Sequence, residues 1–233
     1  MTTFPTPQFH FLRRLRTHND RDWFAKHKPE YQATYAEFKD VCLEIISGLS
    51  DFDEEIFLQP DFYRIFRIYR DIRFRKDKTP YKEHYSCEVV RGGRESGREK
   101  YYWRLKPNNL SLVGAGWFPR NKQDLFAMRR YISSHHEEFT MLLKRVHARG
   151  FELVDYAGKL KTTPRGFDPR DPAIEYLRHQ AWTIMQTWSD EAVKRGNYVE
   201  EVLAQARANQ DYLAFFTRAQ EDIDRHQGDY RLG

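Results

Sequence analysis

The sequence of 233 residues has few cysteines and no long apolar run. Its two cysteines, Cys42 and Cys87, cannot form a disulfide framework, and both lie in apolar patterns typical of small core residues. The most apolar stretch, residues 110–118, is about half as long as a membrane-spanning helix and contains two glycines. The N-terminus lacks the basic and then apolar pattern of a secretory signal. These absences predict a cytoplasmic protein without a membrane partner.

Recognised catalytic and metal-binding motifs are also missing. Gly92–Gly97 and Gly114–Gly116 match no phosphate-binding fingerprint, and we interpret them as a hairpin tip and a place of close backbone packing. The histidines within residues 135–147, which we place on one helix, lack the spacing of a zinc motif. Asp168 and Asp171 could form a carboxylate pair for acid–base work or metal binding, but the prolines that follow them favour turn and cap roles. The motifs therefore assign no catalytic residue, metal or cofactor.

Aromatic residues, in contrast, are abundant. The chain has 17 Phe, 14 Tyr and 5 Trp and a hydrophobic fraction of 40%, which together argue against intrinsic disorder. No internal repeat or linker divides the sequence, so we expect residues 1–233 to form a single α+β domain.

The N-terminal quarter has helical periodicity. Residues 4–27 predict two short helices separated by a polar break at residues 17–20, with Asn19 or Asp20 as the cap of the second. A long amphipathic helix then begins near Pro29, and Gly48 marks its predicted end. Its apolar positions are spaced by three and four residues: Tyr31, Tyr35, Phe38, Cys42, Ile45 and Leu49.

The next segments favour strands. Residues 62–74 alternate between apolar and polar side chains, although arginines at every third position from residue 64 leave a helix open. Residues 85–89 alternate as well, and residues 101–105 and 110–114 flank a Pro-Asn-Asn turn at residues 107–109, which predicts a hairpin.

The remainder is predicted to be mostly helical. One helix covers residues 125–146 and ends near Gly150, another begins at Asp171 and continues with an apolar face to Trp188, and a last one covers residues 199–222. The fold class that follows is α+β, with an antiparallel sheet at roughly residues 62–114 packed against N-terminal and C-terminal helices.

Positive charge is concentrated in the predicted sheet. Residues 61–106 contain 14 Lys and Arg against 7 Asp and Glu, a net of +7, so the remaining chain carries −2 of the overall +5. The densest part is residues 67–82, where aromatic rings lie between the cations. Guanidinium forks and ammonium groups both attract carboxylates and phosphates, and rings can stack on a base or a sugar.

This segment supplies the candidate ligand-binding residues, which are Arg67, Arg70, Arg73, Lys76, Lys78, Tyr81 and Lys82. The functional interpretation is a basic, aromatic-lined site for an anionic small molecule. The structural alternative is that these cations pair with nearby acids, namely Asp61, Asp71, Asp77 and Glu83, and fasten a long loop to the sheet.

Four motifs together resemble one known family. They are Asn19-Asp-Arg-Asp-Trp-Phe24, the string from Asp71 to Lys82 that contains Lys-Asp-Lys-Thr-Pro-Tyr-Lys, Gly114-Ala-Gly-Trp-Phe-Pro119 and Pro164-Arg-Gly-Phe-Asp-Pro169. The set is similar to the conserved hypothetical family labelled domain of unknown function 2461, from about residue 8 to about residue 218. The resemblance implies a single cytoplasmic domain and assigns no activity, substrate or cofactor.

Three functions therefore stay open. The first is a site for an anionic small molecule, in a binding protein or an enzyme. The second is a nucleic-acid-binding protein, since cations and aromatic rings are interleaved in the same segment. The third is a non-catalytic structural or interaction protein in which the basic segment only stabilises the fold.

Overall fold

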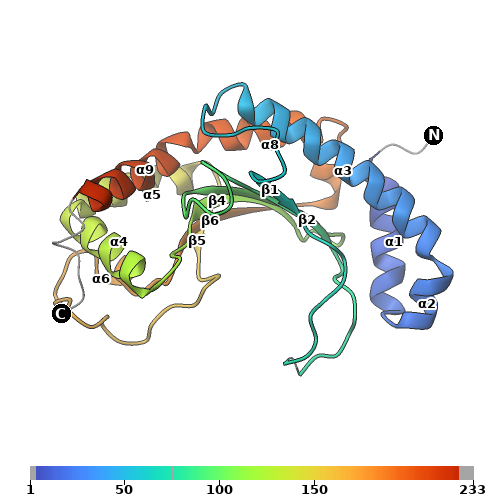
Figure 1. The fold of residues 1–233 in the computed structure, drawn as a ribbon, viewed down its shortest axis with the longest axis horizontal. Helices are drawn as coiled ribbons and strands as arrows, with labels where there is room; N and C mark the ends of the chain where they lie inside the picture. The colour runs from blue at the N-terminus through green and yellow to red at the C-terminus, as the bar shows by residue number, and fades with distance from the viewer. Residues whose placement is uncertain (1–3, 75, 226–233) are drawn as a thin grey trace. The chain divides into compact units, whose positions relative to one another are not determined.

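The computed structural model describes residues 4–74 and 76–225. Its six strands form one antiparallel sheet in the order β1-β2-β3-β4-β6-β5, with helices before and after it in the chain, which confirms the α+β class (Figure 1). The chain groups into two compact units. Unit 1 comprises Met1–Val89, Tyr102–Val113 and Thr187–Gln205, and unit 2 comprises Val90–Tyr101, Gly114–Gln186 and Ala206–Gly233.

Unit 1 begins with three helices, as predicted. They are α1 (Thr6–Thr17), α2 (Arg21–Lys26) and α3 (Lys28–Ser50). Asp20 caps α2, because its side chain accepts a hydrogen bond from the Trp23 backbone N–H at 2.8 Å. The apolar face of α3 is buried, and Cys42 and Cys87 both lie in the core.

The prediction that α3 ends at Gly48 is wrong, since the helix continues to Ser50. The glycine instead makes room for a neighbouring helix. A Cβ atom at this position would lie 2.4 Å from Cδ1 of Leu203, which belongs to α8 (Tyr198–Ala208).

The predicted strand at residues 62–74 is wrong over most of its length, since β1 covers only Tyr63–Ile65. The described residues between 66 and 82 form a loop in which the side chains of Asp71 and Asp77 bind backbone N–H groups two residues further on. The side chain of Asp71 accepts from the N–H of Arg73 at 3.2 Å, and that of Asp77 accepts from the N–H of Thr79 at 3.0 Å. Such turns compete with strand pairing.

The next two predicted strand regions are confirmed. β2 (Tyr85–Val90) pairs with β1 through the register Tyr63↔Val89, and β3 (Lys100–Leu105) and β4 (Ser111–Trp117) form the expected hairpin. Asn108 and Asn109 in its turn have φ angles of 69° and 61°, a region that asparagine tolerates better than most residues.

Two predicted helices are interrupted. Residues 125–146 belong to α4 (Lys122–Ser134) and α5 (His136–Ala148), with His135 between them instead of on the predicted single helix. The His135 ring stacks on Tyr131 of the preceding turn, with ring centroids 4.0 Å apart. The C-terminal helix is likewise divided into α8 and α9 (Gln210–Arg225), and a short α7 (Asp190–Val193) precedes them.

The helix predicted to continue to Trp188 is wrong beyond its first turn. It ends as the short α6 (Ile174–Leu177), and β6 (Trp182–Trp188) follows. β6 pairs with β5 (Glu152–Val154), a strand that was not predicted from the sequence. Apolar residues at 174, 177, 181, 184 and 188 fit a helix, but β-branched and aromatic residues between 182 and 188 favour a strand.

Glycines in β4 allow the backbone of β6 to approach closely, in line with the close packing expected at Gly114–Gly116. A Cβ atom on Gly114 would lie 2.6 Å from the carbonyl oxygen of Ile184. One on Gly116, whose φ is +153°, would lie within 2.3 Å of the carbonyl oxygen of Trp182.

Candidate functional site

The densest group of positive charges lies in the loop between β1 and β2. Residues 66–82, here called the basic loop, contain seven Lys and Arg but only two acids, a formal excess of five positive charges. In Figure 1 it is the long teal loop that connects β1 and β2. All the predicted ligand-binding residues belong to it and are described, whereas Arg75 lies outside the described residues.

Backbone hydrogen bonds close the base of the basic loop. Tyr69 and Tyr81 form an antiparallel bridge, and the Lys82 N–H donates to the carbonyl of Ile68 at 2.7 Å. Ile68 is fully buried. The two ends of the loop are therefore held together as a short ribbon.

The turn between α1 and α2 holds the same ribbon from outside. The Asn19 side-chain amide donates to the carbonyl of Tyr81 at 3.0 Å and accepts from the N–H of Tyr81 at 3.1 Å. The Tyr81 ring stacks on Phe24 with centroids 3.9 Å apart, and only 6% of Tyr81 is exposed. The structure thus places Tyr81, one of the predicted ligand-binding residues, as an anchor of the loop.

Two of the predicted arginines pair with acids of the loop itself. Arg70 binds Asp77 at 2.7 Å and also donates to the Thr79 hydroxyl, while Arg73 binds Asp71 at 2.6 Å. Two hydrogen bonds lower the pKa of Asp77 to about 2: the one from the Thr79 backbone N–H has the larger effect, and the one from the Arg70 side chain comes second. These pairs agree with the structural alternative for part of the segment.

Two of the predicted lysines bind backbone carbonyl groups. The ammonium of Lys78 donates to the carbonyl of Ile72 at 3.0 Å, and that of Lys82 donates to the carbonyl of Arg67 at 2.8 Å. Lys82 also lies 5.1 Å from the ring centroid of Phe66. Both contacts shape the loop without involving an acidic side chain.

Arg67 and Lys76 differ from the other predicted site residues. Both are exposed, and their side chains form no hydrogen bond or ion pair with another residue of the described chain. Arg67 lies near the phenols of Tyr31 and Tyr35 on α3, where its charge partly opposes the effect of burial. Burial raises the pKa of Tyr31 to about 12, so this phenol keeps its proton as a hydrogen-bond donor.

A neighbouring histidine reports the positive field around the loop. Burial is the main cause that lowers the pKa of His84 to about 3, and the charges of Arg104, Lys82, Lys106 and Arg70 contribute in the same direction. The internal acids of the basic loop therefore leave a positive potential at this histidine.

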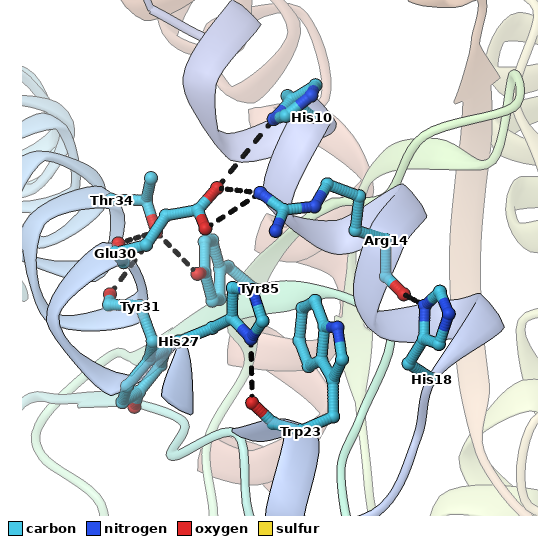
Figure 2. Close-up of polar contacts among 9 residues, drawn as sticks. All are labelled: His10, Arg14, His18, Trp23, His27, Glu30, Tyr31, Thr34 and Tyr85. Carbon is cyan, nitrogen blue, oxygen red and sulfur yellow. Dashed lines mark hydrogen bonds and ion pairs between the residues drawn. The ribbon is translucent and has the colours of Figure 1, made fainter. Parts of the chain in front are cut away.

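A second polar cluster of unit 1 joins the N-terminal helices (Figure 2). Arg14 of α1 binds both carboxylate oxygens of Glu30 on α3, at 3.0 and 2.9 Å, and His10 Nδ1 lies 3.7 Å from the same carboxylate. Sequence reasoning did not single out these three residues, since no local motif joins charges on separate helices.

The Trp23 ring lies between two imidazoles in the same cluster (Figure 2). Its centroid is 4.0 Å from that of His27 and 5.7 Å from that of His18, and both pairs are stacked. Each histidine places Nδ1 against a backbone carbonyl one turn earlier, that of Arg14 for His18 and that of Trp23 for His27. The cluster was not predicted, although Trp23 and His27 have the spacing of helix neighbours.

Figure 2 also shows how α3 is joined to β2. The hydroxyls of Thr34 and Tyr85 lie 2.9 Å apart in the core, and Thr34 also donates to the carbonyl of Glu30 at 3.0 Å. This bond fixes α3, and with it Tyr31 and Tyr35, relative to the strand that follows the basic loop.

These features define an α+β protein with a basic surface loop that is fastened to its N-terminal helices. The chain belongs to a family of conserved hypothetical proteins, the domain of unknown function 2461, whose model matches residues 7–215. This match confirms the resemblance. Neither a curated protein nor a solved structure matches the chain. Among the helices of residues 4–74 and 76–225, none has the length and apolar character needed to cross a bilayer.

Proposed function

We propose that the basic loop binds an anionic small molecule, with Arg67 as the principal contact. The observation that carries the proposal is that Arg67 is exposed and has no acidic partner among the described residues. The loop has seven cations against two acids, and both acids are already engaged by Arg70 and Arg73. An added anion would relieve the repulsion among the remaining charges.

The other predicted residues then take different roles. Lys76 is the second exposed cation that could reach the ligand. Arg70, Arg73, Lys78 and Lys82 give the loop its shape through internal contacts. The anchored ribbon at Tyr81 supports the site, because a rigid loop loses less conformational freedom when it binds.

We expect the ligand to be a carboxylate or a phosphate, because these are the anions that a guanidinium group binds best. A planar fork can hold two oxygens of one anion, and Tyr31 and Tyr35 add phenols close to Arg67. We expect phosphates and dicarboxylates to bind, and neutral analogues of similar size to leave the protein unaffected.

Calorimetric titration with inorganic phosphate, pyrophosphate and succinate tests the proposal. Arg67→Ala should weaken binding by about tenfold, the usual effect of losing one charge-assisted contact. Arg73→Ala is the matched control, since it removes the same charge from the same loop but from a pair with Asp71. Equal losses in both variants, or no binding by the wild type, would contradict the proposal.

A specific observation also supports a second candidate, a single-stranded nucleic acid. Phe74 is 94% exposed and Tyr69 is 48% exposed, so both rings of the basic loop are accessible for stacking on bases. Under this alternative, affinity for an oligonucleotide should fall steeply with rising salt, and Phe74→Ala should weaken binding. Salt-independent binding, or an unaffected Phe74→Ala variant, would exclude this candidate.

A further inference from the structure

Unit 2 contains a buried guanidinium that is paired with no carboxylate of the described residues. Arg129 on α4 is only 8% exposed, and within residues 4–74 and 76–225 no carboxylate lies within ion-pair distance of it. Its one hydrogen bond runs from Nη2 to the carbonyl of His179 at 3.0 Å, and its Nε–H is buried without an acceptor. Burial alone lowers the pKa of Arg129 to about 10, so it stays charged at neutral pH.

An unpaired buried charge is costly, and proteins rarely keep one without a counter-charge. Two carboxylates of the same unit contact the neighbours of Arg129 instead of its guanidinium. Asp171 accepts a hydrogen bond from Ser133, one turn along α4 from Arg129, at 2.5 Å. Asp155 lies 2.9 Å from Nδ1 of His179, although the two groups are not aligned for a hydrogen bond.

The segment of residues 155–179 covers the face of α4 that carries Arg129. Phe126, one turn before Arg129, packs on Phe167 with ring centroids 5.5 Å apart, and Ser133, one turn after it, binds Asp171. Residues spaced by three and four positions share one face of a helix, so Arg129 lies between these two contacts.

His179 adds a second buried polar side chain to the same place. It is only 4% exposed, its carbonyl already binds Arg129, and burial lowers the pKa of its imidazole below the ordinary value. The imidazole is therefore neutral at pH 7 and able to donate or accept a hydrogen bond. The Arg129 guanidinium, which binds the backbone of His179, and the neutral imidazole of the same histidine are both groups that can bind a small anion.

We propose that Arg129 binds an oxyanion, a small carboxylate or phosphate, between α4 and residues 155–179, with His179 as its neighbour. This site goes beyond the proposed function and uses no residue of the basic loop. The guanidinium would hold two oxygens of the ligand through its Nε–H, which has no acceptor among the described residues, and a neighbouring N–H of the same fork.

Nuclear magnetic resonance of the arginine Nε–H groups in the full-length protein tests this site directly. Arg129→Met identifies the Arg129 signal by its disappearance, and the wild type is then titrated separately with inorganic phosphate and with acetate. We expect a saturable shift of the Arg129 signal with at least one of the two anions. The Arg129 signal should shift by the same amount when the anion is added to Arg67→Ala. This result would show that the anion at Arg129 does not depend on the site in the basic loop.

Affinity provides the second measurement. Arg129→Met should weaken binding of the effective anion at this site by about tenfold, while Arg130→Met, which removes the same charge from the next position on α4, should stay within about twofold. An Arg129 signal that does not shift up to roughly 50 mM of either anion would overturn the proposal. If Arg129→Met does not fold, Arg129→Lys removes the same Nε–H signal while keeping the positive charge, so the wild-type titration can still be assigned and decides the matter.

Discussion

Both polar atoms of the Asn19 side chain bind the backbone of Tyr81, 62 positions later in the chain. The amide donates to the Tyr81 carbonyl and accepts from its N–H, so one side chain binds both backbone groups of that residue as a second strand would. The turn between α1 and α2 thereby fixes the position of the basic loop at Tyr81.

Asn19→Ala should destabilise unit 1 and loosen the basic loop. The variant loses two hydrogen bonds, and we expect a decrease of about 1–2 kcal/mol in the free energy of unfolding. Urea denaturation measures this decrease, and hydrogen exchange at the Tyr81 amide should become faster. Asn19→Asp keeps the acceptor but turns a carboxylate oxygen toward the Tyr81 carbonyl oxygen, so it should destabilise the protein at least as much. We call the two hydrogen bonds between Asn19 and Tyr81 the Asn19–Tyr81 clamp. Unchanged exchange at the Tyr81 amide in Asn19→Ala would show that this clamp does not hold the loop.

His84 should make the stability of the protein depend on pH. Its pKa is about 3 in the folded state, against 6.5 for an ordinary histidine, so below pH 6.5 the unfolded chain binds a proton that the folded chain does not. Stability from this residue is complete above pH 6.5 and declines towards pH 3, by at most about 1.4 kcal/mol per pH unit.

The measurement for His84 is urea unfolding at several pH values. In His84→Gln the titrating group is absent, so the decline between pH 6.5 and 3 should be shallower than in the wild type. Carboxylates contribute equally to both curves and cancel in the difference. Parallel curves would contradict the assignment.

Gly116→Ala should be one of the most destabilising small substitutions in the chain. The added methyl would lie within 2.3 Å of the Trp182 carbonyl oxygen, and the φ of +153° is strained for alanine. We expect a loss of roughly 3 kcal/mol or more, measured as a lower melting temperature.

Gly48→Ala is the matched control for this substitution. Its methyl meets only the side chain of Leu203, which can rotate, and alanine gains about 1 kcal/mol in helix propensity over glycine. Its melting temperature should change much less than that of Gly116→Ala. A comparable loss in both variants would mean that Leu203 cannot move.

We also propose that the chain unfolds as a single domain. The boundaries between units 1 and 2 fall inside β2, β3, β4 and β6, so separate unfolding would have to interrupt these strands. Differential scanning calorimetry should therefore show one cooperative transition, with equal calorimetric and van't Hoff enthalpies. Two resolved transitions would contradict this proposal.

The sequence was most informative where hydrophobic period and local signals agree. The apolar spacing of α3, the Asp20 cap and the asparagine turn between β3 and β4 were all predictable from neighbouring residues. β6 was not, because the apolar positions from Ile174 to Trp188 also satisfy a helical period, and only pairing with a strand distant in sequence decides between them.

The candidate site shows the same limit. Charge counting located the basic loop, but it could not distinguish Arg67, which is exposed, from Arg70 and Arg73, which Asp77 and Asp71 engage. That distinction depends on the turns at the two aspartates. Arg129 gave no signal at all, because burial of a single arginine is set by segments that meet only in the folded chain.

The Asn19–Tyr81 clamp bears on the order of events during translation. Synthesis proceeds from the N-terminus, and domains begin to fold as they emerge from the ribosome. Both partners of the clamp are translated before any residue of β3, and more than a hundred residues before α9 begins. The nascent chain thus acquires the means to fasten its basic loop long before its last helix has been made.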